Sequence, residues 1–417
     1  MSKKSGVKVR MYRQGLGDCF LIALPRAAGS PFHMLIDCGV ILGTHDAPAK
    51  MQEVLADIAA TTRQIDLLVI THEHWDHVSG FLQAKDAFSK LEIKQVWVAW
   101  TEDPDDPIAK QLRAEHYSMR VALTAACARM RVGSPVHSLL EFFGAAGGQS
   151  TRSALDFAKT LGTSTPRFCL PSDAPVAIKG TGARIYVLGP PRDIKKIKNF
   201  NPSKAHPETY GLAAVSPLND ADVNAPFDPI VQIPLEAARQ MPYFQTRYWG
   251  EDSDSSEKDQ AWRRIDDDWL DVSSSLALQL DSATNNTSLV LAIELKNGDV
   301  LLFAGDAQVG NWLSWQDLTW APDLLDRTVL YKTGHHGSHN ATLRENGLEL
   351  MKNLQIALIP VDHEMAKKKG WGKMPFDPLE TRLNEITKGR VLRIDKPVPP
   401  ALSSQVAATP LYFEVTI

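Results

Sequence analysis

Residues 65–80 read IDLLVITHEHWDHVSG and decide how the rest of the chain is interpreted. The first half is a short apolar run rich in β-branched residues, which predicts a buried strand. The second half crowds three histidines and two carboxylates into His72-Glu73-His74-Trp75-Asp76-His77. Imidazole nitrogens and carboxylate oxygens bind divalent metals such as zinc. We therefore predict a metal site at the end of this strand, held by His72, His74, Asp76 and His77. A helical H-E-x-x-H protease site is excluded, because Asp76 stands four residues after His72.

Two later strands also end on groups that bind metals. An apolar strand over residues 300–305 (VLLFAG) is followed by Asp306, and a strand over residues 329–333 is followed by His335 and His336. A carboxylate between two metal ions can bridge them at roughly 3.5–4 Å. Asp306 suits that role, and one of the two histidines would add a further ligand.

The beginning of the chain contributes a tight turn and a buried carboxylate. Residues 7–25 predict two strands joined at Gly15-Leu16-Gly17-Asp18, where the glycines suit positive φ. The next strand, over residues 32–37, ends in Asp37. A buried carboxylate is costly unless it is hydrogen-bonded or close to positive charge. We therefore expect Asp37 to support the metal site.

Strands and helices alternate along the remaining chain, which is typical of an α/β fold. Helical periodicity covers residues 47–60, 78–91, 269–280, 341–354 and 379–388, and predominates over 103–162. Further strands are expected at residues 93–100, 176–179, 184–188, 288–295, 356–361, 391–394 and 411–416. Residues 192–270 are irregular and rich in Pro, Asn and Asp, which is typical either of a lid over a substrate or of a mobile loop.

Composition limits the class of protein. The 417 residues carry a net charge of -4, which argues against a generally basic nucleic-acid binder. The cysteines at positions 19, 38, 127 and 169 show no C-x-x-C spacing and are interpreted as reduced, buried residues. Neither a signal peptide nor a run of 18 apolar residues is present. We therefore expect a cytoplasmic protein without a membrane span.

With these motifs together, the chain resembles the metallo-β-lactamase superfamily over nearly its whole length. The resemblance is carried by Ile36-Asp37-Cys38-Gly39, Thr71 to His77, Gly305-Asp306-Ala307 and Gly334-His335-His336-Gly337-Ser338. Within the superfamily it is most similar to the metallo-hydrolase domain of the competence protein ComEC. This implies an αββα sandwich of two mixed β-sheets flanked by helices. We expect one domain over residues 1–417, with a helical insertion at about 103–162 and an irregular one at 192–270.

The resemblance also implies a binuclear ligand set. His72 and His74 would bind the first metal, Asp76 and His77 the second, and Asp306 would bridge them. His336 is the preferred further ligand, which leaves His335 to contact a phosphate or to protonate the leaving group. Asp76 and Asp306 would orient a metal-bound hydroxide. The metals would be two divalent ions, with zinc preferred to manganese.

One histidine that many relatives have is not evident in this chain. It would complete the ligands of the first metal, and the candidates are His116, His137 and His206. Asn285, Asn286 or water are the alternatives. Other groups expected to hold the ligands or to contact substrate are Asp18, Asp37, Asn286, Lys332, Ser338 and His339.

The expected activity is metal-dependent hydrolysis, with a phosphodiesterase or nuclease as the first hypothesis. The substrate would contain phosphate and include nucleic acids or nucleotides. Lys367-Lys368-Lys369, expected in a loop, would either bind phosphate or form a solvated charge run. The alternative is a hydrolase of small esters, lactones or lactams. A non-catalytic binding protein is the third hypothesis, with Trp312 and Trp315 either at a partner surface or packed in the core.

Overall fold

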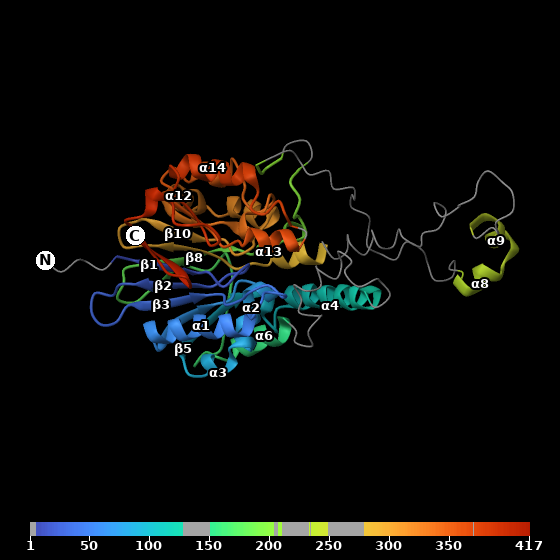
Figure 1. The fold of residues 1–417 in the computed structure, drawn as a ribbon, viewed down its shortest axis with the longest axis horizontal. Helices are drawn as coiled ribbons and strands as arrows, with labels where there is room; N and C mark the ends of the chain where they lie inside the picture. Colours follow the sequence, from blue (N-terminus) through green and yellow to red (C-terminus); the bar gives the residue numbers. More distant parts are fainter. Residues whose placement is uncertain are drawn as a thin grey trace.

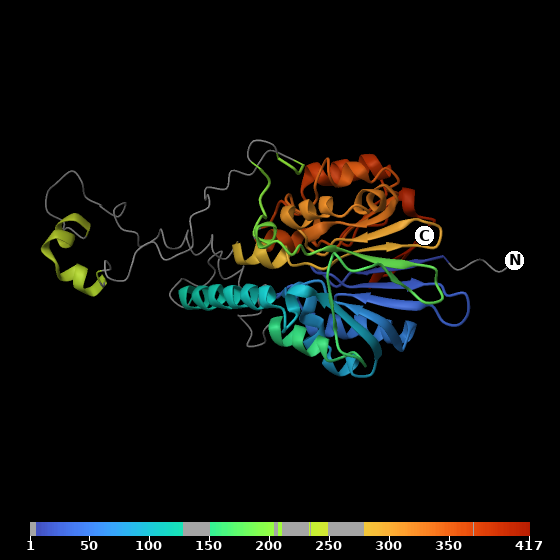
Figure 2. The same cartoon turned by 180° about the vertical axis from the view of Figure 1, so that it is seen from behind.

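The computed structural model describes residues 6–127, 151–203, 207–210, 233, 235–248, 279–369 and 371–417. In these residues two mixed β-sheets pack face to face, and helices cover both outer faces (Figure 1). This is the αββα sandwich expected from the sequence. Figure 2 shows the same layers from behind, with α4 (Pro107–Cys127) extending from one end of the sandwich.

The first sheet contains eight strands in the order β14-β15-β1-β2-β3-β4-β5-β6. Its strands β3 to β6 are parallel, whereas the others pair antiparallel. The strands are β1 (Lys8–Tyr12), β2 (Phe20–Leu24), β3 (Phe32–Ile36), β4 (Gln64–Val69), β5 (Glu92–Ala99), β6 (Arg167–Cys169), β14 (Val406–Ala408) and β15 (Tyr412–Thr416).

The second sheet contains seven strands in the order β13-β12-β11-β10-β9-β8-β7. Strands β10 to β13 are parallel, which mirrors the arrangement in the first sheet. The strands are β7 (Val176–Ala177), β8 (Arg184–Gly189), β9 (Val290–Glu294), β10 (Val300–Phe303), β11 (Thr328–Lys332), β12 (Ile356–Ile359) and β13 (Val391–Arg393).

Apolar side chains fill the space between the sheets and the space beneath each helical layer. Between the sheets, Phe20 of β2 and Phe303 of β10 meet edge to face. Outside the first sheet lie α1 (Ala47–Thr61), α2 (Trp75–Gln83) and α6 (Thr151–Lys159). Outside the second lie α11 (Val309–Ser314), α12 (Ala321–Asp326) and α14 (Asp377–Thr387). Each face of each sheet is therefore covered, as parallel strands require.

Most predicted elements are confirmed, with end points shifted by a few residues. The helix expected over residues 78–91 is divided into α2 and α3 (Lys85–Phe88) at Ala84, whose backbone leaves the helical region. Strands β6 and β14 were not predicted. The two indoles of Trp312 and Trp315 are buried and lie 3.9 Å apart between ring centroids, so they pack in the core and the partner-surface interpretation is wrong.

Three sequence-based predictions are corrected by the structure. Residues 341–354 form turns and one 3-10 turn (Leu348–Leu350) instead of a helix, because Leu343 pairs with Thr209 and Leu348 N–H donates to the Leu343 carbonyl. Lys367 and Lys368 lie in α13 (His363–Lys368), not in a loop. The stretch 192–270 contains α7 (Ile194–Ile197), α8 (Leu235–Gln240) and α9 (Pro242–Tyr248).

Some predictions fall outside the described residues. These are most of the helix at 269–280, part of each insertion, and the candidate ligands His137 and His206. Cys19, Cys38 and Cys169 are free and buried, as expected. Of the described helices, none combines the length and apolarity needed to cross a membrane.

Candidate metal centre

Four parallel strands deliver the predicted donors to one rim of the sandwich. Asp37 directly follows β3, and the hexapeptide follows β4 in the first sheet. Asp306 follows β10, and the histidine pair follows β11 in the second. Since β3 pairs with β4 and β10 with β11, the carboxyl ends lie together in each sheet. Open α/β folds place their chemistry at such ends.

The centre of the site is a buried cluster of Asp76, His77, Asp306 and His336. One ligand-type atom from each lies within 4.8 Å of the others. His336 Nε2 is 3.0 Å from Asp76 Oδ2 and 3.5 Å from Asp306 Oδ2, and His77 Nε2 is 3.2 Å from Asp306 Oδ2. Asp76 and His77 follow a strand of the first sheet, whereas Asp306 and His336 follow strands of the second sheet, more than 200 residues later in the sequence. The fold therefore brings the four residues together.

His72 and His74 form a second pair beside this cluster. His72 Nε2 is 3.0 Å from His74 Nδ1 and 4.0 Å from Asp306 Oδ2. Two atoms that share a tetrahedral zinc at 2.0–2.1 Å lie about 3.3 Å apart. The spacing of the two imidazole nitrogens therefore suits one ion, and Asp306 lies between this pair and the other three residues of the cluster.

Three of these histidines are oriented by a group on the other ring nitrogen. His77 Nδ1 is 2.8 Å from Asp37 Oδ2, and His336 Nδ1 is 2.9 Å from the Pro360 carbonyl. His72 Nδ1 is 3.0 Å from the Thr71 hydroxyl. A proton held on Nδ1 leaves the Nε2 lone pair for a metal, which is how supporting groups tune metal-binding histidines.

Backbone conformation at the site is unusual. Asp37, His335 and His336 have φ of 53°, 43° and 50°, which is the left-handed region that non-glycine residues rarely adopt. Thr71 secures Asp37 by donating its backbone N–H (2.8 Å) and its hydroxyl (2.6 Å) to the two carboxylate oxygens. Strained residues of this kind gather at functional sites, where the surroundings hold them in place.

A buried lysine holds the Asp306 carboxylate in place. Lys332 Nζ lies 2.5 Å from Asp18 Oδ2 and 3.4 Å from Asp306 Oδ1, and it donates to the Gly305 carbonyl at 2.8 Å. Asp18 comes from the turn in which Gly15 and Gly17 adopt positive φ, as predicted. Lys332 and Asp18 therefore position Asp306, while its other oxygen faces the histidines.

Burial and charged neighbours shift the pKa values of the residues in this site. Burial opposes the charged form of His77, but Asp306 and Asp76 outweigh it and raise its pKa well above the usual value. Burial also opposes the charged form of Asp306, but His77 and His336 hold its pKa well below the usual value. Burial lowers the pKa of His74 to about 3, which makes it a neutral donor.

The donor set fits divalent cations. Asp18, Asp37, Asp76 and Asp306 are all buried, and Lys332 is the one buried ammonium that faces them among the described residues. Within the same residues, Asp76 Oδ1 has no hydrogen-bond partner. Buried carboxylates need compensating charge, and imidazole with carboxylate is a set that zinc or manganese binds.

Several expected residues do not face the cluster. The amide nitrogen of Asn286 donates to the Ile197 and Asn199 carbonyls, and its oxygen accepts from backbone N–H groups of Gln308 and Asn311. Asn286 therefore holds loops together through four hydrogen bonds to backbone groups.

Residues near His335 and His336 also make contacts outside the cluster. His335 is half-buried, with Nδ1 3.3 Å from Gln308 Nε2. Ser338 donates to Asn340, and the ring of His339 packs near Phe376, so their described contacts lie away from the cluster.

Asp281 is a buried residue of the site that was not predicted from the sequence. This residue lies in a helical segment at 279–285, is 6% exposed, and has its Oδ1 3.6 Å from His74 Nε2. Asp281 and Asn285 are four residues apart on that helix, and Asn285 donates to Asp281 Oδ2 at 3.2 Å. This i,i+4 pair next to the SLVLAIEL strand is the local signal at Asp281, but it does not predict the contact with His74.

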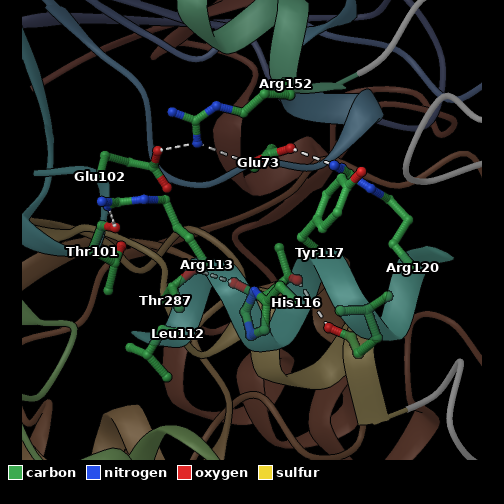
Figure 3. A pocket seen from close by; sticks show the side chains of 12 residues that line it. Glu73, Thr101, Glu102, Leu112, Arg113, His116, Tyr117, Arg120, Arg152 and Thr287 are labelled. Carbon is green, nitrogen blue, oxygen red and sulfur yellow. Dashed lines mark hydrogen bonds and ion pairs between the residues drawn. The ribbon is translucent and has the colours of Figure 1, made fainter. Parts of the chain in front are cut away.

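A cavity of about 430 Å³ has one residue of the hexapeptide, Glu73, on its wall. Figure 3 shows Arg113, Arg120 and Arg152 on its walls, together with Glu73, which lies between His72 and His74 in the sequence. Arg120 and Arg152 form ion pairs with Glu73. His116, a candidate for the missing ligand, lies on α4 in this cavity wall, and burial lowers its pKa to about 4.

Comparison with known families agrees with this geometry. Residues 13–104 match the family model of the metallo-beta-lactamase superfamily. The fold is that of the metallo-β-lactamase superfamily. The matched segment contains Asp37 and the hexapeptide, while Asp306 and His336 lie beyond it and join the site through the fold. No curated protein matches the chain. The superfamily is largely hydrolytic, and with the buried His/Asp cluster it indicates a metal-dependent hydrolase.

Proposed function

We propose that this protein is a binuclear metal-dependent phosphodiesterase or nuclease. The observation that carries the proposal is the position of Asp306, between the His72–His74 pair and the Asp76–His77–His336 group. A shared carboxylate flanked by two donor groups is the arrangement that two-metal hydrolases use.

The chain offers a separate set of donors for each ion. His72 and His74 would hold the first ion, and Asp76, His77 and His336 the second, with Asp306 common to both. Bound divalent ions would lower the pKa of a water molecule and polarise the scissile bond. Lys332 and Asp37 keep Asp306 and His77 in place, so the donors need little rearrangement.

His335 supplies a hydrogen-bond donor at the edge of the site. The Gln308 amide is placed to donate to Nδ1, which leaves the proton on Nε2. In this tautomer Nε2–H can donate to a phosphoryl oxygen or to the leaving group, as the sequence analysis expected. The half-buried position of His335, next to the buried His336, suits contact with substrate.

The cavity lined by Glu73 favours an anionic substrate. Its three arginines outnumber the two acidic residues on its walls, Glu73 and Glu102. Guanidinium groups match phosphate geometry and bind it through paired hydrogen bonds. The similarity to the ComEC domain also favours nucleic acid, with cyclic or linear nucleotides as smaller substrates.

Hydrolysis of small esters, lactones or lactams is the second candidate. It is favoured by the apolar part of the same cavity, where Leu112, Tyr117 and Leu280 face the arginines. A net charge of -4 also makes long polyanions less favourable substrates than small molecules.

The test is a substrate panel with purified, metal-free protein reconstituted with Zn²⁺ or Mn²⁺. The substrates are bis-p-nitrophenyl phosphate, single-stranded DNA, RNA, cyclic dinucleotides, an acyl lactone and nitrocefin. We expect metal-dependent cleavage of a phosphodiester by the wild type and a loss of at least 100-fold in His74→Ala. Cleavage of nitrocefin or lactone alone would support the second candidate. Equal inactivity of both proteins on every substrate would refute catalysis.

A further inference from the structure

His74 differs from the other histidines of the site in which ring nitrogen faces the donors. In His77 and His336 the Nε2 atom faces carboxylates of the cluster, whereas in His74 it is Nδ1 that faces His72 Nε2. The outer nitrogen of His74 is therefore Nε2. That atom lies 3.6 Å from Asp281 Oδ1.

Asp281 is a buried carboxylate whose two oxygens differ in their hydrogen bonding. Its Oδ2 accepts from Asn285 Nδ2, while its Oδ1 has no hydrogen bond within the described parts of the chain. The side chain is 6% exposed, so water does not solvate it freely. A buried acceptor of this kind is costly unless a donor satisfies it.

We propose that Asp281 is the positioning residue for His74: it accepts the Nε2 proton and so directs the Nδ1 lone pair to the first metal ion. The inference rests on the proposed metal centre and adds the group that orients its fourth histidine. The same device occurs three times nearby, through Asp37, the Pro360 carbonyl and the Thr71 hydroxyl. Closing the gap from 3.6 Å to a hydrogen bond needs a shift of less than 1 Å.

The geometry favours this role over direct metal binding by Asp281. A carboxylate oxygen that shared a metal with His74 would lie near Nδ1, about 3.3 Å away for a tetrahedral ion. Asp281 Oδ1 instead faces the opposite nitrogen. The first ion then has His72, His74 and Asp306 as protein ligands and keeps an open position, as catalytic sites do.

The experiment measures metal binding by the full chain. Wild type, Asp281→Asn, Asp281→Glu and the exposed control Asp86→Asn are titrated with Zn²⁺ against a competing chelator, and bound metal is counted at saturation. We expect two equivalents in all four proteins, an affinity at one site 10- to 100-fold lower in Asp281→Asn, and partial recovery in Asp281→Glu. The Co²⁺ absorption bands should shift in Asp281→Asn and stay unchanged in the control.

The other possible outcomes would overturn the positioning role of Asp281, alone or together with the proposed function. Unchanged affinity in Asp281→Asn overturns the positioning role alone, and loss of one equivalent at saturation overturns it in favour of direct binding. A wild type that binds no metal overturns the proposed function together with this inference. Histidine ¹⁵N NMR of the loaded wild type gives a test that needs no variant: His74 should carry its proton on Nε2, and a proton on Nδ1 would refute the proposal.

Discussion

Replacing Gly39 with alanine should weaken metal binding while leaving the protein folded. A Cβ at Gly39 would lie 2.4 Å from the carbonyl carbon and oxygen of Asp76 and 2.5 Å from the His77 nitrogen. Ordinary contacts begin at 3.4 Å, so the backbone carrying these two ligands must retreat by about 1 Å. Metal–ligand distances tolerate about 0.2 Å, whereas one extra methyl group in a packed region costs about 1–3 kcal/mol of stability.

The matched control is Gly372→Ala. A Cβ there would meet nothing closer than Lys367 Cγ at 3.7 Å, which is an ordinary contact. Metal content is measured after reconstitution, and thermal unfolding is followed by circular dichroism. We expect Gly39→Ala to melt cooperatively and to lose at least one equivalent of metal, while Gly372→Ala keeps both. If Gly39→Ala bound two equivalents with wild-type affinity, the close approach of Gly39 to Asp76 would not matter and the reasoning would fail.

Three further predictions follow from specific contacts. Asp37→Asn should weaken metal binding 10- to 100-fold in chelator competition, because an amide nitrogen cannot accept the His77 Nδ1 proton; wild-type affinity would contradict this. Metal removal should lower the free energy of unfolding, by about 2.7 kcal/mol relative to a metal concentration 100 times Kd; urea curves that coincide with and without chelator would be inconsistent with a folded-state site. Hydrogen bonds from Arg382 lower the pKa of Glu349 from its usual value of 4.5 to about 2. The ionised carboxylate therefore stabilises the fold fully at pH values above 4.5. This stabilisation is lost as the pH falls towards 2. Glu349→Gln should therefore cost on the order of 1 kcal/mol at pH 7 and nothing near pH 2, and a cost that did not change with pH would argue against the ion pair.

The sequence predicted the part of the site that local pattern encodes. The hexapeptide lies at a strand end and enters α2, as its apolar run and its spacing indicated. Asp306 was recognisable because a lone carboxylate after a buried strand is unusual. By contrast, only the family resemblance favoured His336 over His335 as the further ligand, because the two are neighbours on the same turn and local pattern does not distinguish them. In the structure the His336 ring is the one buried among the carboxylates, with Nε2 3.0 Å from Asp76 Oδ2.

Other features depended on tertiary contacts that no local pattern contains. Asp281 resembles a residue on the polar face of a helix, and its burial against His74 follows only from the packing of that helix on the rim. Asn286 was expected near the metals, but its amide is used by four backbone groups from distant segments. Residues 341–354 have helical periodicity, yet the bridge between Leu343 and Thr209 and the close packing of Gly347 on the Leu343 carbonyl favour turns.

The most direct test of the central claim is anomalous diffraction at the zinc absorption edge from crystals of the reconstituted protein. We expect two peaks roughly 3.5–4 Å apart, one beside His72 and His74 and one beside Asp76, His77 and His336, with Asp306 between them. A single peak, or none at this rim in protein that hydrolyses a phosphodiester, would contradict it.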